Sequence, residues 1–184
     1  MDSLDLGEKY YNQGSEQYFK DGNTDGALKS FRAAAAAGYE PACGEIGSIL
    51  LEKKEEPERA EIWFRKVHKI DFLSPMAQYD FGVLLYNEQD DWESALPLFS
   101  KAAEAEYVPA YQAIGMIHFK EKHEVDEAEV WFEKAKEAGF LWGAPALYYG
   151  MILEFERGIE GMADLYMAKA LDDLHGAETQ ENSK

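Results

Sequence analysis

The chain has 184 residues, of which 46% are hydrophobic and 14% aromatic, a composition that excludes a disordered protein and allows a substantial core. Its formal net charge is −18, from 36 acidic and 18 basic residues. This excess of acid argues against nucleic acid and anionic membrane surfaces as partners, because both attract clustered Lys and Arg, and it permits a basic protein partner.

The location of the protein is predicted from three features of the chain. Residues 1–5 contain neither a basic region nor an apolar run, so we expect no secretory signal. No stretch approaches the roughly 20 apolar residues that a helix needs to cross a bilayer. The single cysteine, Cys43, has no second cysteine with which to form a disulfide within the chain. Together these features predict a soluble, cytoplasmic protein.

The sequence consists of five similar units. In each unit a glycine is followed seventeen residues later by a large apolar residue, and an alanine stands four residues before the latter. The glycines are Gly14, Gly47, Gly82, Gly115 and Gly150, and the apolar residues are Phe31, Phe64, Phe99, Phe132 and Met167. Successive glycines are 33 or 35 residues apart, a period typical of stacked pairs of helices. The sequence therefore predicts an all-α fold of about five two-helix repeats.

In chain order, we expect each unit to hold a first helix around its glycine and a second helix around its apolar residue. Polar loops, such as residues 21–25 and 121–126, separate the two helices and supply N-caps. Prolines such as Pro41 and Pro109 end one unit and begin the next. One repeat domain is predicted over 1–176, with units near 5–41, 42–75, 76–109, 110–144 and 145–176. Residues 177–184 contain nothing to bury and are predicted to be a disordered tail.

The recurring glycine indicates close packing. A glycine inside a helix costs about 1 kcal/mol relative to alanine. Its repetition at one phase predicts that the second helix of each pair approaches so closely that a Cβ would collide. In the second helix, the alanine and the apolar residue lie one turn apart on the buried face.

This pattern resembles the Sel-one-like repeat, a relative of the tetratricopeptide repeat. The resemblance rests on alanine, an apolar residue and glycine in the first helix (Ala110, Ile114, Gly115), and on alanine, a Trp-Phe pair and Lys-Ala in the second (residues 128–135). It spans residues 5–176. It implies a right-handed α-α superhelical solenoid, in which the first helices line the concave face.

The predicted binding surface follows from this resemblance. Positions three before, one after and four after each glycine should point into the concave face, where aromatic and Met side chains are typical anchors for a partner. An alternative is that this stripe packs internally against neighbouring helices. The predicted partner-binding residues are Tyr11, Tyr18, Leu51, Tyr79, Val83, Tyr86, Gln112, Met116, Phe119, Leu147, Met151 and Glu154.

We expect no metal site, no cofactor and no catalytic site. His118 and His123 are five residues apart and lack a third ligand. The acidic residues within 88–93 lack the glycine and terminal glutamate of a calcium loop and are interpreted as a solvated turn with N-caps. Cys43 lies near a helix start, where the dipole would lower its pKa, but it is interpreted as a small core residue. Without a phosphate-binding loop, nucleophile elbow or dinucleotide fingerprint, the chain is predicted not to be an enzyme.

The function predicted from the sequence is that of a non-enzymatic protein–protein interaction module, a scaffold or adaptor that binds a protein or peptide in the concave face. A basic partner fits the charge, and a monomer is favoured. The alternative is a stoichiometric inhibitor, such as an immunity protein that neutralises a basic toxin or enzyme. Neither nucleic acid nor a membrane is expected as a partner.

Overall fold

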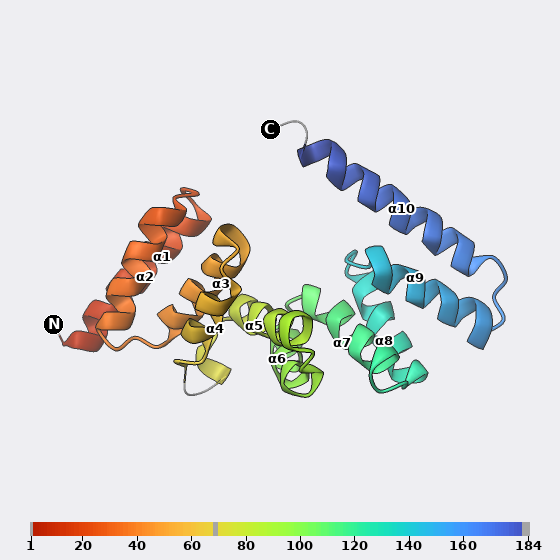
Figure 1. The fold of residues 1–184 in the computed structure, drawn as a ribbon, viewed down its shortest axis with the longest axis horizontal. Helices are drawn as coiled ribbons and strands as arrows, with labels where there is room; N and C mark the ends of the chain where they lie inside the picture. Colours follow the sequence, from red (N-terminus) through yellow and green to blue (C-terminus); the bar gives the residue numbers. More distant parts are fainter. Residues whose placement is uncertain (1, 68–69, 182–184) are drawn as a thin grey trace. The chain divides into compact units, whose positions relative to one another are not determined.

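The structure, a computed structural model, describes residues 2–67 and 70–181. Within these ranges it contains ten α-helices, a short 3-10 helix and a π-helix, and no strand. Consecutive α-helices form five hairpin pairs, from α1 with α2 to α9 with α10 (Figure 1). The prediction of an all-α fold of five helix pairs is confirmed. In the described residues, no helix is long and apolar enough to span a bilayer.

Each pair consists of a first and a second helix. The first helices of the pairs are α1 Ser3–Phe19, α3 Pro41–Lys54, α5 Pro75–Gln89, α7 Pro109–Lys120 and α9 Gly143–Met151. The second helices are α2 Thr24–Ala36, α4 Pro57–Phe64, α6 Trp92–Glu104, α8 Val125–Glu137 and α10 Met162–Glu181. The 3-10 helix is Ile70–Phe72, and the π-helix Ile152–Glu156 continues α9.

The contacts divide the chain into two compact units, Met1–Ala105 and Glu106–Lys184. The first holds the pairs from α1 to α6, and the second holds the pairs from α7 to α10. The division falls at the connection between the third and fourth predicted repeats. Each unit is a stack of helix pairs, and the right-handed superhelix over the whole chain stays a prediction.

Helix starts are encoded by short polar residues and by proline. Asn23, Ser74 and Asp91 are N-caps whose side-chain oxygens accept backbone N–H bonds of 3.0, 3.2 and 3.0 Å, respectively. Proline stands in the first turn of α3, α4, α5 and α7, where its missing N–H leaves no helical bond unmade. These features place the boundaries of the pairs.

The glycines of the first four units lie against the phenylalanine of the same unit, as the sequence predicts. A Cβ added to Gly82 would lie 2.7 Å from Cε1 of Phe99, and one added to Gly47 would lie 2.6 Å from Cε1 of Phe64. The corresponding rings of Phe31 and Phe132 stand equally close to their glycines. Phe31, Phe64, Phe99 and Phe132 are each at most 1% exposed. The glycine removes the atom that would prevent this approach.

The tryptophan of the Trp-Phe pair lies beside the buried phenylalanine and is covered by a lysine. Nζ of Lys66 lies 3.7 Å from the ring centroid of Trp63, and Nζ of Lys134 lies 4.1 Å from that of Trp131. Both pairs are three residues apart, one turn of the second helix. The lysine of the repeat signature therefore shields an aromatic face from water.

The fifth pair departs from the predicted register. The residue packed on Gly150 is Tyr166, whose Cβ would lie 2.7 Å from an added Cβ, while Met167 is 46% exposed. The prediction of Met167 at this position is wrong. The first helix of this pair ends in the π-helix Ile152–Glu156, and the contact with Gly150 comes sixteen residues later instead of seventeen.

Helix α10 continues beyond the predicted start of the tail. The sequence places the tail at 177–184, whereas α10 runs to Glu181, and residues 182–184 lie outside the described residues. No proline interrupts the segment after Met162, and its Ala, Leu and Glu residues have high helix propensity. Gly176 alone does not end the helix.

Candidate functional site

The predicted binding residues of the first compact unit lie on its first helices. Tyr11 and Tyr18 stand on α1, Leu51 on α3, and Tyr79, Val83 and Tyr86 on α5. All six side chains are half-buried. The stripe is therefore neither fully exposed nor fully buried within this unit, and its role in partner binding stays a prediction.

The tyrosine rings of this stripe divide their contacts between the core and neighbouring helices. The ring of Tyr11 packs 5.5 Å from that of Phe31 and 5.2 Å from that of Tyr39, and Tyr79 packs 5.6 Å from Phe99, between ring centroids. The hydroxyl groups of Tyr11 and Tyr18 reach across to α3. The stripe thus combines packing with polar contacts.

Several of the predicted binding residues of the second compact unit lie in or against its interior. Met116 and Phe119 pack against the core of this unit, and the Phe119 ring lies 5.0 Å from that of Tyr148, between centroids. Gln112 is only 8% exposed, because α7 is flanked by α8 and α9, so its prediction as an accessible residue is wrong. Leu147 and Met151 are half-buried.

Glu154 has a structural partner in the same unit. Its carboxylate accepts the backbone N–H of Ala163 at 2.8 Å. This bond satisfies one of the free N–H groups in the first turn of α10, as an N-cap would. Glu154, which the sequence predicts to face a partner, therefore caps the N-terminus of α10.

An acidic cluster accompanies the stripe in the first unit. We define it as Glu45 and Glu52 of α3 and Asp80 of α5. The Tyr11 hydroxyl donates to Oε1 of Glu45 at 3.3 Å, and the Tyr18 hydroxyl donates to Oε2 of Glu52 at 3.3 Å. Both bonds join residues 34 positions apart, so they link corresponding turns of α1 and α3.

Asp80 is the most unusual member of the cluster. It is 4% exposed, and its Oδ2 has no hydrogen-bond partner. Oγ of Ser48, on the facing turn of α3, is also buried and also lacks a partner. Burial, together with the negative charges of Glu52 and Glu45, raises the pKa of Asp80 to about 7, although the nearby Ser48 hydroxyl acts to lower it.

Glu45 shares this buried environment. It is 3% exposed, and burial raises its pKa, while hydrogen bonds from Ser74 and Tyr11 oppose the shift. Burial and the charges of Glu52, Asp80 and Glu45 raise the pKa of Tyr18 to about 12. All three carboxyl groups of the cluster therefore contribute to the pKa of the Tyr18 hydroxyl. Glu52 is exposed and has a long contact of 3.9 Å with Lys53.

The cluster can accept hydrogen bonds and attract positive charge. In the part of the chain that the structure describes, neither Glu45 nor Asp80 forms an ion pair, and no group of three His, Cys, Asp or Glu side chains could hold a metal ion. A buried carboxyl without a counter-ion costs stability. The position therefore indicates either a carboxyl kept neutral or a site for a cation from outside the chain.

Sequence reasoning did not select Glu45, Asp80 or Glu52. A signal was present, because Glu45 and Asp80 both stand two residues before the repeat glycine, in helices that are otherwise mostly apolar. A lone acid at the same phase of two successive first helices predicts that the two acids face each other between the helices. The predicted stripe used the adjacent phase and so captured only the tyrosines around them.

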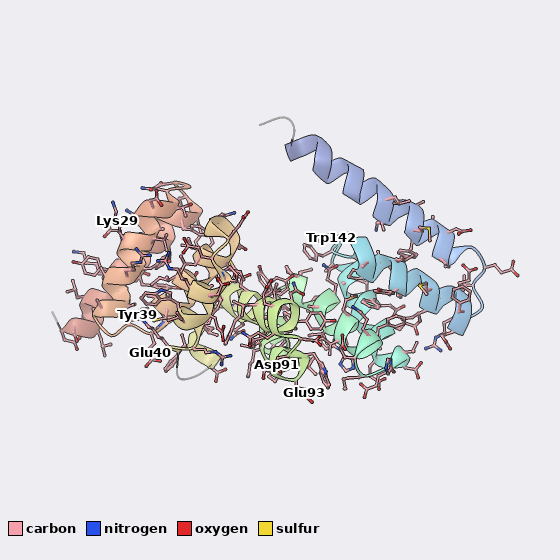
Figure 2. All side chains as sticks on the ribbon, viewed as in Figure 1. Lys29, Tyr39, Glu40, Asp91, Glu93 and Trp142 are labelled. Atoms are coloured by element: carbon pink, nitrogen blue, oxygen red, sulfur yellow. The ribbon has the colours of Figure 1, made fainter. Side chains whose placement is uncertain are left out.

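The other candidate groups are accounted for by local structure. Asp91 caps α6, and Figure 2 shows Asp91 and Glu93 close together at the start of that helix. Nδ1 of His118 lies 2.8 Å from Oε2 of Glu124. Cys43 is 6% exposed, and burial raises its pKa, contrary to the lowering that a helix start alone would cause.

Comparison with known proteins identifies the fold. No protein-family model and no curated protein matches the chain. Among solved structures, MamA is 21% identical with a TM-score of 0.60, over 90% of this chain and 96% of its own. The pilF protein of Pseudomonas aeruginosa is 21% identical with a TM-score of 0.64, over 92% of this chain and 77% of its own.

A Sel1 repeat protein from Oxalobacter formigenes is 20% identical with a TM-score of 0.62, and the match covers 91% of this chain and 73% of that protein. The chain therefore has the fold of the tetratricopeptide and Sel1-like repeat proteins. The resemblance stated from the sequence is confirmed at the level of the fold.

Proposed function

We propose that the protein is a non-enzymatic interaction module that binds a protein or peptide through its first helices. The support comes from the half-buried stripe on α1, α3 and α5, which offers tyrosine hydroxyls and apolar side chains on one stack of helices. Tyrosine is a frequent anchor at protein interfaces because it combines a large apolar ring with a polar tip. Proteins with this fold are typically interaction scaffolds.

The observation that carries the proposal is the bonding of Tyr11 and Tyr18 to the acidic cluster in one compact unit. The Tyr18 hydroxyl donates to Glu52, and the negative charge of Asp80 helps to raise the pKa of Tyr18. Asp80 in turn neighbours Tyr79 on α5. Residues from three first helices therefore contribute to one surface. A partner that covers this surface contacts several repeats at once, which is the usual mode of a stacked helical array.

Site-specific photocrosslinking in cells tests the proposal. Benzoylphenylalanine is placed at Tyr18 or Val83, on the proposed surface, and at Ile62 as a control. Ile62 is 59% exposed on α4, in the same compact unit. We expect one partner to be crosslinked from positions 18 and 83 and not from 62. Crosslinking from position 62 alone, or equally from all three positions, contradicts the proposal.

A stoichiometric inhibitor of a basic protein is the second candidate, and the net charge of −18 favours it. The two candidates differ in what the crosslinked partner does. An inhibitor forms a 1:1 complex that abolishes the partner's activity, and the complex weakens as salt concentration rises. A scaffold leaves the partner active and is crosslinked to more than one protein.

A further inference from the structure

The strongest unexplained feature is a buried acid with an unused oxygen. Asp80 is 4% exposed and its Oδ2 has no partner, and the buried Ser48 Oγ nearby also has none. Buried polar atoms without partners are few in native proteins, and each calls for an explanation, of which a bound ion or other functional group is one. Glu45 and Glu52 add negative charge to the same place.

The exposure of the acidic side chains increases along α3. Glu45 is 3% exposed, and Glu52, two turns later, is exposed, with the half-buried Tyr18 bonded to it. Glu52 and Tyr18 are therefore the solvent-accessible members of this group, and Asp80 is buried. The half-buried ring of Tyr18, which is bonded to Glu52, suits the apolar stem of a lysine, whose charged end has three N–H donors.

We propose that the acidic cluster binds the ammonium group of a lysine side chain from a basic segment of the partner, with Asp80, Glu52 and the Ser48 hydroxyl as acceptors. The inference rests on the proposed function, since it names the chemistry that the binding surface recognises. An ammonium group suits acceptors that come from separate helices, whereas the planar fork of arginine favours both oxygens of one carboxylate.

A direct test uses the peptide acetyl-Gly-Gly-Lys-Gly-Gly-amide as the probe. The full chain is titrated with it at constant ionic strength, while NMR follows the backbone amides and the side-chain carboxyl carbon of Asp80. We expect saturable shifts confined to α1, α3 and α5. The same peptide with Gln in place of Lys should produce none, because it lacks the positive charge.

The pH dependence gives a second readout. The groups that face Asp80 are Glu45 and Glu52 from α3, Tyr18 from α1 and its neighbour Tyr79 on α5. With a pKa of about 7, Asp80 is mostly ionised at pH 8 and mostly protonated at pH 6. Binding of a cation should therefore be about tenfold weaker at pH 6 than at pH 8.

Two variants on α5 separate the site from general electrostatics. Asp80→Asn should weaken binding of the lysine peptide at least about tenfold at pH 8, since each tenfold change corresponds to the loss of one modest charged contact. Asp90→Asn removes an equal charge from the exposed C-cap of α5, ten residues further along the chain, and should leave binding unchanged. Circular dichroism verifies that both variants keep their helices.

Three results would overturn the inference. They are equal binding of the Gln peptide, equal effects of the two variants, and tighter binding of the corresponding Arg peptide than of the Lys peptide. The photocrosslinking experiment keeps the two proposals apart. If Asp80→Asn is crosslinked to the partner from positions 18 and 83 as strongly as the unmodified chain, the interaction surface stands and the lysine site falls.

Discussion

Gly82 and Phe99 illustrate how a single residue sets the distance within a helix pair. Cε1 of the Phe99 ring lies 2.7 Å from the position that a Cβ of residue 82 would occupy, and Phe99 is 1% exposed. Since a core is packed as densely as a crystal, a displaced ring must move other buried side chains. The close approach therefore outweighs the propensity cost of glycine in α5, about 1 kcal/mol.

Gly82→Ala should lower the free energy of unfolding by about 1–3 kcal/mol, because the added methyl group overpacks the interface with Phe99. Urea unfolding followed by circular dichroism measures this change. In the double variant with Phe99→Leu, the smaller side chain should recover part of the loss, so that the two effects are not additive. An increase in stability from Gly82→Ala alone, as helix propensity would give, contradicts the packing argument.

Asp80 links stability to pH. Burial raises its pKa to about 7 in the folded chain, so the native state binds more protons than the unfolded state between about pH 4 and pH 7. The free energy of unfolding therefore falls as pH rises through this window, and the cost is complete above pH 7. A carboxyl in this position is retained at the expense of stability, as expected of a residue with a binding role.

Asp80→Asn should raise the free energy of unfolding by about 2–4 kcal/mol at pH 8, since the amide has no charge to bury. The gain should shrink steadily as the pH is lowered from 7 to 4. Denaturant unfolding at several pH values provides the measurement, with the exposed Asp90→Asn as the matched control. A gain that is independent of pH would mean that the carboxyl is not buried in its charged form.

At the level of helix pairs, α9 and α10 obey the repeat pattern only in part. The glycine-to-phenylalanine spacing predicts the four earlier pairs because it encodes a steric contact, and that contact recurs wherever the connection between helices has the same geometry. Periodicity carries no information about the π-helix that ends the first helix of the fifth pair, and in that pair the contact with Gly150 is made by Tyr166 instead of Met167. The end of α10 was missed for a similar reason, since a polar helix end has no apolar period.

In the candidate site, too, the repeat pattern predicts some residues and not others. The sequence predicts the tyrosines of the proposed surface, because their spacing from the glycine places them on one face of each first helix. It did not identify Asp80 or Glu45, because their importance arises from a facing helix that the pattern of one helix does not describe. The same limit applies in the second unit, where Gln112 is buried and the carboxylate of Glu154 bonds to the backbone of α10.

A pair of variants tests the register of the fifth pair. Tyr166 is half-buried, and its ring packs 5.4 Å from that of Tyr149 between centroids, so Tyr166→Ala should lower the free energy of unfolding by about 2–4 kcal/mol. Met167→Ala removes an exposed side chain and should change it by no more than about 0.5 kcal/mol. Thermal and urea unfolding distinguish the two variants, and the reverse order of effects would restore the register predicted from the sequence.

For the molecule as a whole, the dominant electrostatic term is repulsion. The net charge is −18, and described ion pairs such as Lys20–Glu16 and Lys101–Glu104 lie at the surface, where such pairs contribute little. Like charges spread over a compact chain destabilise it, and salt screens them over about 8 Å at physiological ionic strength. Screening should therefore stabilise this protein, whereas it would weaken a protein that depends on its ion pairs.

Raising NaCl from about 20 mM to about 200 mM at pH 8 should increase Tm by a few degrees, which for a chain of this length corresponds to roughly 1 kcal/mol. The same step near the sequence pI of about 4.5 should have little effect, because there the net charge is close to zero. Calorimetry at both pH values gives the comparison. A fall in Tm with salt at pH 8 would show that attraction between charges outweighs repulsion. It would also remove the argument that the acidic surface is available to a basic partner.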